Sequence, residues 1–475
     1  MLSLNRIIAK TTILKNFSVL TLSSVLTQFL GIFVSIKIAR SLNPLGFGTY
    51  NLLQLHVYIF TVVASFGLRN IIIRNIARNK TLVKKVFFTA IILRVVGFFL
   101  SIIFFAGYFF LYRHYDTLLF VLVIQCILST ILFDLFESVA FGLEKMEFTS
   151  LINLLSSGFW LGSVILIPKS QFTLHLIFGL FVLFSSLKSI AYFFSLYKVE
   201  YIKGFQSEYI EKLQIIKFSK ESFPYYYLAL FTLLSNQIPL LFLEHRSGIA
   251  QIGFFNIASK LLMPINLIID TALAAIFPTL SRLYTTNYRL FVKNVKLIFI
   301  LITLFCIAGA FCITLFRQDF VRLLYGKEYI SSSLVLGYQG WYVAVYSVVC
   351  LIGTILSAIN KQKELGYMSI ICTIIQVPIL WYASKFGAQY LSAAFLVATI
   401  ISFIIHIYVI NIYLKSDLSL IFYLKIIALF MIGYFASLLI PVDLNFFFKM
   451  IIFMSISIVG GYFIFLNYKQ KSWLK

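Results

Sequence analysis

Long apolar segments separated by short polar loops run through the whole sequence. A bilayer core is crossed by about 20 apolar residues in a helix. Fourteen segments meet this length, at approximately residues 17–36, 48–68, 86–111, 117–136, 149–167, 172–196, 218–243, 251–280, 291–316, 331–358, 365–383, 387–413, 419–440 and 446–467. Such continuous runs favour helices over the strands of a barrel, which alternate over about ten residues. The pattern predicts an all-α polytopic membrane protein with about 14 transmembrane helices.

Composition supports the same class. Of 475 residues, 61% are hydrophobic and 12% are charged, whereas soluble domains have about 45–50% and about 25%. This excludes a cytosolic enzyme, a secreted disulfide scaffold and a nucleic-acid-binding module. The net charge of +23 therefore indicates basic cytoplasmic loops rather than a nucleic-acid partner. The first apolar run is too long for a cleavable signal peptide.

The distribution of Lys and Arg predicts the topology. Most of the 39 basic residues fall on one side if the N-terminus is cytoplasmic, and an even number of spans returns the C-terminus there. We expect an N-terminal lobe at 1–196, a cytoplasmic linker at 197–217, a C-terminal lobe at 218–413, and spans 13 and 14 with a tail at 414–475. No loop is large enough for an extramembrane catalytic domain, so we expect no enzyme.

Two short segments recur and suggest an internal repeat. Arg40-Ser41 followed by Gly48-Thr49-Tyr50-Asn51 matches Arg246-Ser247 followed by Gly253-Phe254-Phe255-Asn256, and Gly142-Leu143-Glu144-Lys145 weakly matches Ala358-Ile359-Asn360-Lys361. Both pairs join equivalent loops if spans 1–6 are repeated as spans 7–12. The halves would then share one orientation. Chance similarity between apolar sequences is the alternative.

Motifs for common chemistries are absent. There is no phosphate-binding GxxxxGK[ST] loop and no HExxH, the five histidines are scattered, and the odd number of cysteines shows no CxxC. We expect no metal site and no cofactor. Asp134 and Glu137 share one helical face, three residues apart, and we interpret them as the solvated cytoplasmic end of a helix.

Two cations lie deep inside predicted spans. Arg94 is about eight residues into span 3, and Lys260 is about nine residues into span 8. A charge at the bilayer centre costs about 2.5–3.5 kcal/mol on insertion scales. Each therefore indicates a water-filled path or an anionic partner, with an internal ion pair as the alternative. Asp270 is too far along the same helix to contact Lys260 directly.

Further candidates are less deeply placed. Lys37 and Arg40 at the outer end of span 1 and Arg69 at the inner end of span 2 can reach the interface by snorkelling, and they are weaker candidates for substrate binding. Asp270 could carry a proton or a sodium ion, or form an ion pair. Pro264, one turn after Lys260, is a hinge candidate because proline interrupts helix hydrogen bonding.

Four stretches resemble the polysaccharide flippases of the multidrug/oligosaccharidyl-lipid/polysaccharide exporter superfamily, which include the Wzx-type flippases. They are KIARSLNPLGFGTYN at 37–51, FGLRNIIIRNIAR at 66–78, the segment 252–282 with Lys260-Leu261, and the segment 324–359 with LLYGKEYISSS and LSAINKQ. The resemblance extends over about residues 10–410. The acid that the family often carries near Asn236-Gln237 is missing here.

The resemblance implies two six-helix lobes in a V, with two extra C-terminal helices and alternating access. It implies a flippase that moves undecaprenyl-diphosphate-linked oligosaccharide across the bacterial cytoplasmic (inner) membrane, for O-antigen, lipopolysaccharide, capsule or exopolysaccharide synthesis. A polysaccharide polymerase and a chain-length regulator would be partners, besides membrane lipid, and a proton or sodium gradient could drive transport. On this interpretation Lys260, Arg94, Lys37, Arg40 and Arg69 bind the diphosphate.

Two other functions compete with this expectation. A small-molecule or drug exporter of the same superfamily would usually have twelve spans and an acidic cavity. A membrane polysaccharide polymerase or glycosyltransferase would change bonds in the glycan, and would more often carry acidic or arginine pairs on a sizeable outer loop.

Overall fold

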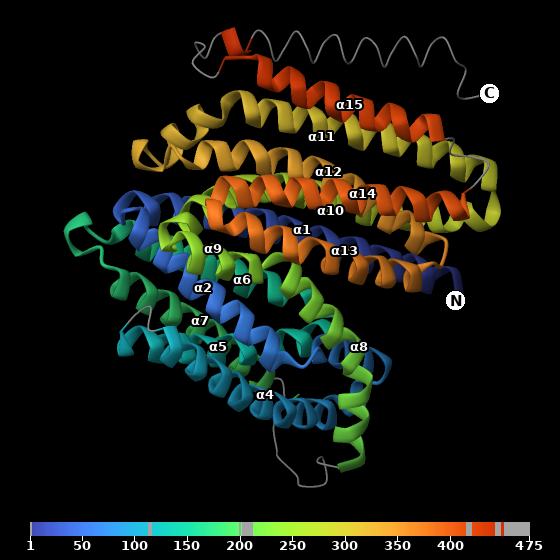
Figure 1. The fold of residues 1–475 in the computed structure, drawn as a ribbon. Helices are drawn as coiled ribbons and strands as arrows, with labels where there is room; N and C mark the ends of the chain where they lie inside the picture. The colour runs from blue at the N-terminus through green and yellow to red at the C-terminus, as the bar shows by residue number, and fades with distance from the viewer. Residues whose placement is uncertain are drawn as a thin grey trace. The chain divides into compact units, whose positions relative to one another are not determined.

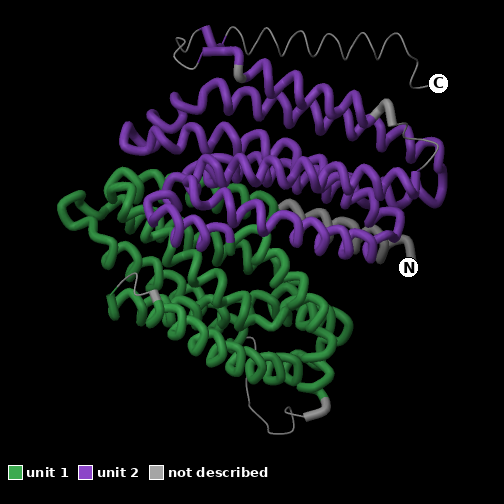
Figure 2. Tube along the Cα trace, in the orientation of Figure 1, with its two compact units in different colours: residues 1–238 green, residues 239–475 purple. Residues whose placement is uncertain are grey.

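The computed structural model describes residues 2–112, 116–198, 201, 212–414, 420–441 and 448–450, and side chains from residue 19 onward. Its regular elements are α-helices and short 3-10 helices. The helices form two compact units, Met1–Ile238 and Pro239–Lys475 (Figure 2).

The described part of unit 1 contains eight α-helices, most of which are labelled in Figure 1. They are α1 (Leu2–Ser41), α2 (Pro44–Ser65), α3 (Leu68–Arg78), α4 (Val83–Tyr112), α5 (Thr117–Gly142), α6 (Met146–Leu166), α7 (Leu174–Lys198) and α8 (Lys212–Asn236). Helix α5 is central, because α2, α3, α4, α6 and α7 all pack against it. Its buried face is built from apolar residues such as Cys126, Ile127, Ile131 and Leu135.

Unit 2 contains the remaining helices. They are α9 (Ile238–Ser247), α10 (Ile249–Thr286), α11 (Tyr288–Leu324), α12 (Ser332–Ala358), α13 (Gln362–Ala383), α14 (Ala388–Tyr413) and α15 (Leu420–Leu439). Helix α12 is the central element and contacts α10, α11, α13 and α14, while α15 packs along α11 (Figure 1).

Eleven of the described helical segments are long and apolar enough to cross a membrane, or twelve if α2 and α3 form one bent span. The all-α multi-pass fold is therefore confirmed. The thirteenth predicted span, 419–440, corresponds to the shorter apolar helix α15. The fourteenth, 446–467, lies outside the described residues except for 448–450.

The second predicted span, 48–68, corresponds to α2 and ends at a sharp bend. Helices α2 and α3 meet at an angle of 52°, where Phe66 and Gly67 adopt φ values of 49° and 65°. A Cβ on Gly67 would lie 2.5 Å from the backbone nitrogen of Tyr226 in α8. Glycine is required here both for the left-handed conformation and for the close approach of α8.

The boundary between the units also differs from the expected lobe boundary. The expected second lobe begins at residue 218, but α8 packs on α2, α3 and α4 of unit 1. The ion pair between Arg74 and Glu221 and the hydrogen bond from Tyr226 to the Val63 carbonyl (3.3 Å) contribute to this packing. The polar segment 202–211, within the predicted linker, lies outside the described residues.

Local geometry repeats at the positions of the two sequence matches. Asn51 donates to the Phe47 carbonyl at 2.7 Å in α2, and Asn256 donates to the Ile252 carbonyl at 3.0 Å in α10. After α5 and α12, Glu144 and Asn360 both adopt left-handed φ values, 61° and 62°. The second pair of segments thus forms matched turns, and the first pair lies in helices with the same side-chain hydrogen bond, as expected for a repeat.

Candidate functional site

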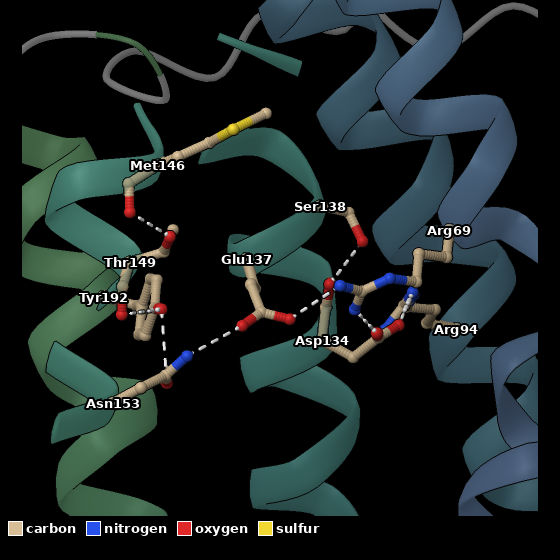
Figure 3. A network of polar contacts seen from close by, with 9 residues as sticks. All are labelled: Arg69, Arg94, Asp134, Glu137, Ser138, Met146, Thr149, Asn153 and Tyr192. Atoms are coloured by element: carbon tan, nitrogen blue, oxygen red, sulfur yellow. Dashed lines mark hydrogen bonds and ion pairs between the residues drawn. The ribbon is translucent and has the colours of Figure 1, made fainter. Parts of the chain in front are cut away.

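A network of charged and polar side chains lies inside unit 1 (Figure 3). Its centre is α5, which presents Asp134 and Glu137 on one face because they are three residues apart. Arg69 of α3 donates to both carboxylates, to Asp134 and at 2.8 Å to Glu137. One guanidinium thus holds two acids, which fixes the short helix α3 against α5.

Arg94 completes the shell around Asp134. It donates to the second Asp134 oxygen at 2.5 Å and to the Ile131 carbonyl at 2.5 Å. Its side chain is only 2% exposed. The structure therefore places Arg94 in an internal ion pair, which was the alternative to a water-filled path. Arg94 neutralises Asp134. The side chain of Arg69, which also bonds Asp134, is 39% exposed.

Glu137 links this ion-pair cluster to α6 and α7. Asn153 donates to its free oxygen at 3.2 Å, and Tyr192 donates to the Thr149 carbonyl at 3.2 Å and approaches the Asn153 side chain at 3.5 Å (Figure 3). With Glu137 only 8% exposed, the expectation that Asp134 and Glu137 form a solvated helix end is wrong. Four helices surround them, so they are interior groups.

Lys188 is a cation that the sequence analysis did not assign to this site. It lies in α7, and its ammonium is 3.7 Å from the centre of the Phe133 ring. Among the described residues Lys188 forms no hydrogen bond or ion pair. The available signal is its position inside the predicted span 172–196, close to the polar loop that follows this span.

The other predicted site residues lie elsewhere. Lys37 and Arg40 are in the last turns of α1, where Lys37 is half-buried 5.9 Å from the Phe172 ring centre and Arg40 is exposed. Lys260 is half-buried in α10 of unit 2, and Asp270 is exposed on the same helix. The network in unit 1 therefore contains two of the five predicted cations, Arg69 and Arg94.

Pro264 lies within α10, which continues as one helix from Ile249 to Thr286. The sharp bend in the described residues is instead at Phe66 and Gly67. The hinge at Pro264 stays a prediction.

The network contains more cations than acids. Arg69, Arg94 and Lys188 carry three positive charges, and Asp134 and Glu137 carry two negative charges. Both carboxylates are bonded by arginine, whereas Lys188 lies over the Phe133 ring and near Glu137 without a hydrogen bond among the described residues. The network can therefore offer a positive charge to an anion, while its acids are already bonded.

Comparison with known proteins identifies the group to which the chain is related. A sequence profile described as "polysaccharide biosynthesis protein" matches residues 13–284. This chain belongs to the polysaccharide biosynthesis protein family. The expected relationship to polysaccharide exporters is thereby confirmed. No curated protein matches the chain at a significant level.

Solved structures show how this polysaccharide biosynthesis protein folds. It resembles an inward-facing multidrug resistance MATE family transporter of the MOP superfamily, with TM-score 0.59, 17% identity, and coverage of 82% of this chain and 96% of that one. A MOP superfamily transporter from Pyrococcus furiosus, described by the reverse polarity of its binding pocket, gives TM-score 0.58 and 14% identity, with coverage of 88% and 96%.

A mutant form of the Vibrio cholerae MATE transporter VcmN gives TM-score 0.52 and 14% identity, with coverage of 87% of this chain and 99% of that one. The polysaccharide biosynthesis protein therefore has the MATE-like transporter fold, with the relatives matched over nearly their whole length. It is a multi-pass membrane protein with that fold.

Proposed function

We propose that this chain is a flippase for undecaprenyl-diphosphate-linked oligosaccharide, which it moves from the inner to the outer leaflet of the bacterial cytoplasmic membrane. The observation that carries the proposal is the family match over residues 13–284 in a chain with a transporter fold. Polysaccharide biosynthesis at a membrane needs a step that carries the lipid-linked sugar across the bilayer. Alternating access would supply that step.

The charges of unit 1 support an anionic substrate. Lys188 forms no ion pair among the described residues, and Arg69 is 39% exposed although it already holds two acids. A diphosphate loses its hydration when it leaves water, and charge-assisted hydrogen bonds from such cations offset that loss. We assign the first contact with the diphosphate to Lys188 and Arg69, with Lys260, Lys37 and Arg40 as further candidates.

A drug exporter of the same superfamily is the second candidate, because two of the solved relatives described above are MATE transporters. An acidic group that attracts a cationic drug must be free to bind it. In unit 1 Asp134 and Glu137 are both held by arginine. The charges of unit 1 therefore favour an anionic substrate over a cationic drug.

The test uses purified full-length protein in vesicles that contain labelled undecaprenyl-diphosphate oligosaccharide. We expect the wild type to expose the sugar to the opposite leaflet with its bonds intact. Lys188→Gln should slow this movement at least about tenfold, since a charge-assisted hydrogen bond contributes about 1.5–3 kcal/mol. Lys198→Gln, an exposed lysine at the end of the same helix, is the matched control.

The outcomes separate the three functions. A normal rate for Lys188→Gln would remove this residue from substrate binding. Movement of cationic dyes without movement of the lipid-linked sugar would indicate the drug exporter. Growth of the glycan chain in the vesicles would indicate a polymerase or glycosyltransferase.

A further inference from the structure

A second basic site lies in unit 2, where α11, α12 and α15 come together. Arg317 is near the C-terminal end of α11 and is half-buried. Its guanidinium lies against the backbone of α12, because a Cβ built on Gly337 would be 3.1 Å from Arg317 Nη1. Tyr338 follows Gly337 on α12, and Tyr434 of α15 packs against Trp341, one turn further along α12. Three helices thus bring one cation and two hydroxyls together.

Arg317 has no acidic partner among the described residues. The nearest carboxylate in sequence, Asp319, accepts a hydrogen bond from Lys449 at 2.6 Å, and the Lys449 side chain is 2% exposed. Within the described part of the chain Arg317 forms no hydrogen bond or ion pair, and its Nε is buried without an acceptor. A buried guanidinium nitrogen without an acceptor is costly. The half-buried guanidinium of Arg317 can therefore donate hydrogen bonds to an acceptor from outside the described residues.

The surroundings of Arg317 are built tightly. Trp341 of α12 packs edge-on against Tyr434, with ring centres 5.6 Å apart. Gly433 allows α15 to approach this closely, since a Cβ there would lie 2.9 Å from Ile307 and 3.0 Å from Trp341. Trp341 is 2% exposed. Tyr434 is thereby held by packing against α12.

The chemistry of the three polar groups points to one kind of ligand. A guanidinium has five N–H donors and no acceptor, and neither phenol has a hydrogen-bond partner among the described residues. Arginine binds phosphate through two parallel hydrogen bonds. Arginine, tyrosine and tryptophan near helix ends are also typical of the level of the lipid headgroups.

We propose that Arg317, Tyr338 and Tyr434 bind the phosphate of a membrane lipid. The phosphate could belong to a polyprenyl phosphate or to an anionic phospholipid, and both would present the same oxygens to the guanidinium. This site lies in unit 2 and shares no residue with the network of unit 1. The inference therefore goes beyond the proposed function and does not depend on it.

Lipid binding to the purified full-length chain tests the proposal. The protein is stripped of lipid in detergent and mixed separately with phosphatidylglycerol, undecaprenyl phosphate, or undecaprenol, which has no phosphate. Native mass spectrometry then counts the lipids retained. We expect retention of a phosphate-bearing lipid but not of undecaprenol. Arg317→Gln should weaken retention at least about tenfold.

Matched variants separate binding from folding. Arg322→Gln removes an exposed arginine of the same helix and should retain lipid like the wild type. Arg317→Lys keeps the charge and should retain lipid partly. The double variant Tyr338→Phe and Tyr434→Phe keeps the rings and should weaken retention several-fold.

The lipid arms assign the source of the phosphate. Retention of phosphatidylglycerol alone, or of undecaprenyl phosphate alone, would support the site and identify its ligand. Equal retention by the wild type and Arg317→Gln, or equal retention of undecaprenol, would overturn the proposal. Counting the retained lipids requires no transport, so a loss of flippase activity would not affect this result.

Discussion

Asp134 is an ionised group in a protein interior, and it is stable there because two arginines reach it from different helices. Arg94 and Arg69 each donate to a separate oxygen of the carboxylate. Removal of one partner from a buried pair leaves an uncompensated charge, whereas removal of both charges does not. Arg94 and Asp134 therefore hold α4 against α5 only when both side chains are present.

Loss of Arg94 should destabilise the protein. We expect Arg94→Gln to lower the free energy of unfolding by about 3 kcal/mol, because Asp134 loses one of its two cations. Arg94→Gln with Asp134→Asn should recover part of this loss. Thermal melting of the purified protein in detergent measures both, with Arg78→Gln on the exposed end of α3 as control. If Arg94→Gln melts at the wild-type temperature and abolishes transport, its role is substrate binding instead.

Asp116 outside the membrane-spanning segments gives a pH-dependent prediction. It caps α5 by accepting from the Leu119 backbone N–H at 3.0 Å, and it contacts His175 at 2.6 Å. The Leu119 hydrogen bond, followed by His175, lowers the pKa of Asp116 below its ordinary value of 3.8. Because the folded state has the lower pKa, this stabilisation is present above pH 3.8 and is lost as the pH falls through the folded pKa.

We expect Asp116→Ala to destabilise the protein by about 1 kcal/mol at neutral pH, the usual value of an N-cap. Asp116→Asn keeps the cap but not the charge, so the difference between wild type and Asp116→Asn should shrink below pH 3.8. Melting temperatures at several pH values test this. A difference that stays constant down to about pH 2.5, a value about one unit below an ordinary carboxyl pKa, would contradict it.

Sequence alone revealed some of these residues and misjudged others. Arg94 stands out because it is a charge within an apolar run, and its ion pair was among the alternatives. Asp134 and Glu137 were recognised as neighbours on one face, but their depth was misjudged, because it depends on how α3, α6 and α7 pack on α5. Lys188 was missed because the sequence does not show how far it lies from the end of its helix.

At the level of elements, α2 and α3 show how two distant segments determine a break. The bend occurs at Gly67, and α8 passes so closely that only a hydrogen fits at this position. The aromatic rings of Phe66 and Tyr226 contact each other with centres 5.5 Å apart. Apolar periodicity predicts that a helix crosses here, but not that it bends, because the cause lies in α8, far along the chain.

Gly67→Ala should therefore loosen the packing of α8 on α3. The left-handed conformation alone costs a non-glycine residue about 1–2 kcal/mol, and the contact with the Tyr226 backbone adds to it. Gly107→Ala in α4 is the matched control, because nothing lies within 4 Å of its Cβ position, and alanine should stabilise the helix by up to about 1 kcal/mol. Equal melting temperatures for the two variants would show that the approach of α8 is not constrained.

At the level of the whole chain, the two predicted halves share local features. The turns at Glu144 and Asn360 have the same left-handed conformation, and in both halves the helix before the turn packs on the last helix of its six-span half, α5 on α7 and α12 on α14. One structural plan therefore serves both halves. The packing of α8 was not predictable from this plan, since the corresponding α1 packs on α6.

Helix α8 begins the second half of the repeat, yet it is bound to α3 of the first half by Arg74 and Glu221. If α8 moves with the second half of the repeat during transport, this contact must open in one state of the cycle. We expect a short bifunctional thiol reagent to arrest lipid-linked sugar transport in the variant Arg74→Cys with Glu221→Cys. Cleavage of a reducible linker should restore it, because the block is mechanical.

The controls for this experiment are the two single-cysteine variants treated with the same reagent. They account for the five native cysteines, which are buried or half-buried, and for loss of the ion pair itself, which at a partly exposed site contributes about 0–1 kcal/mol. Transport at the control rate in the linked double variant would show that α3 and α8 move as one body throughout the cycle. The opening would then have to occur between other elements, and Gly67 would serve folding alone.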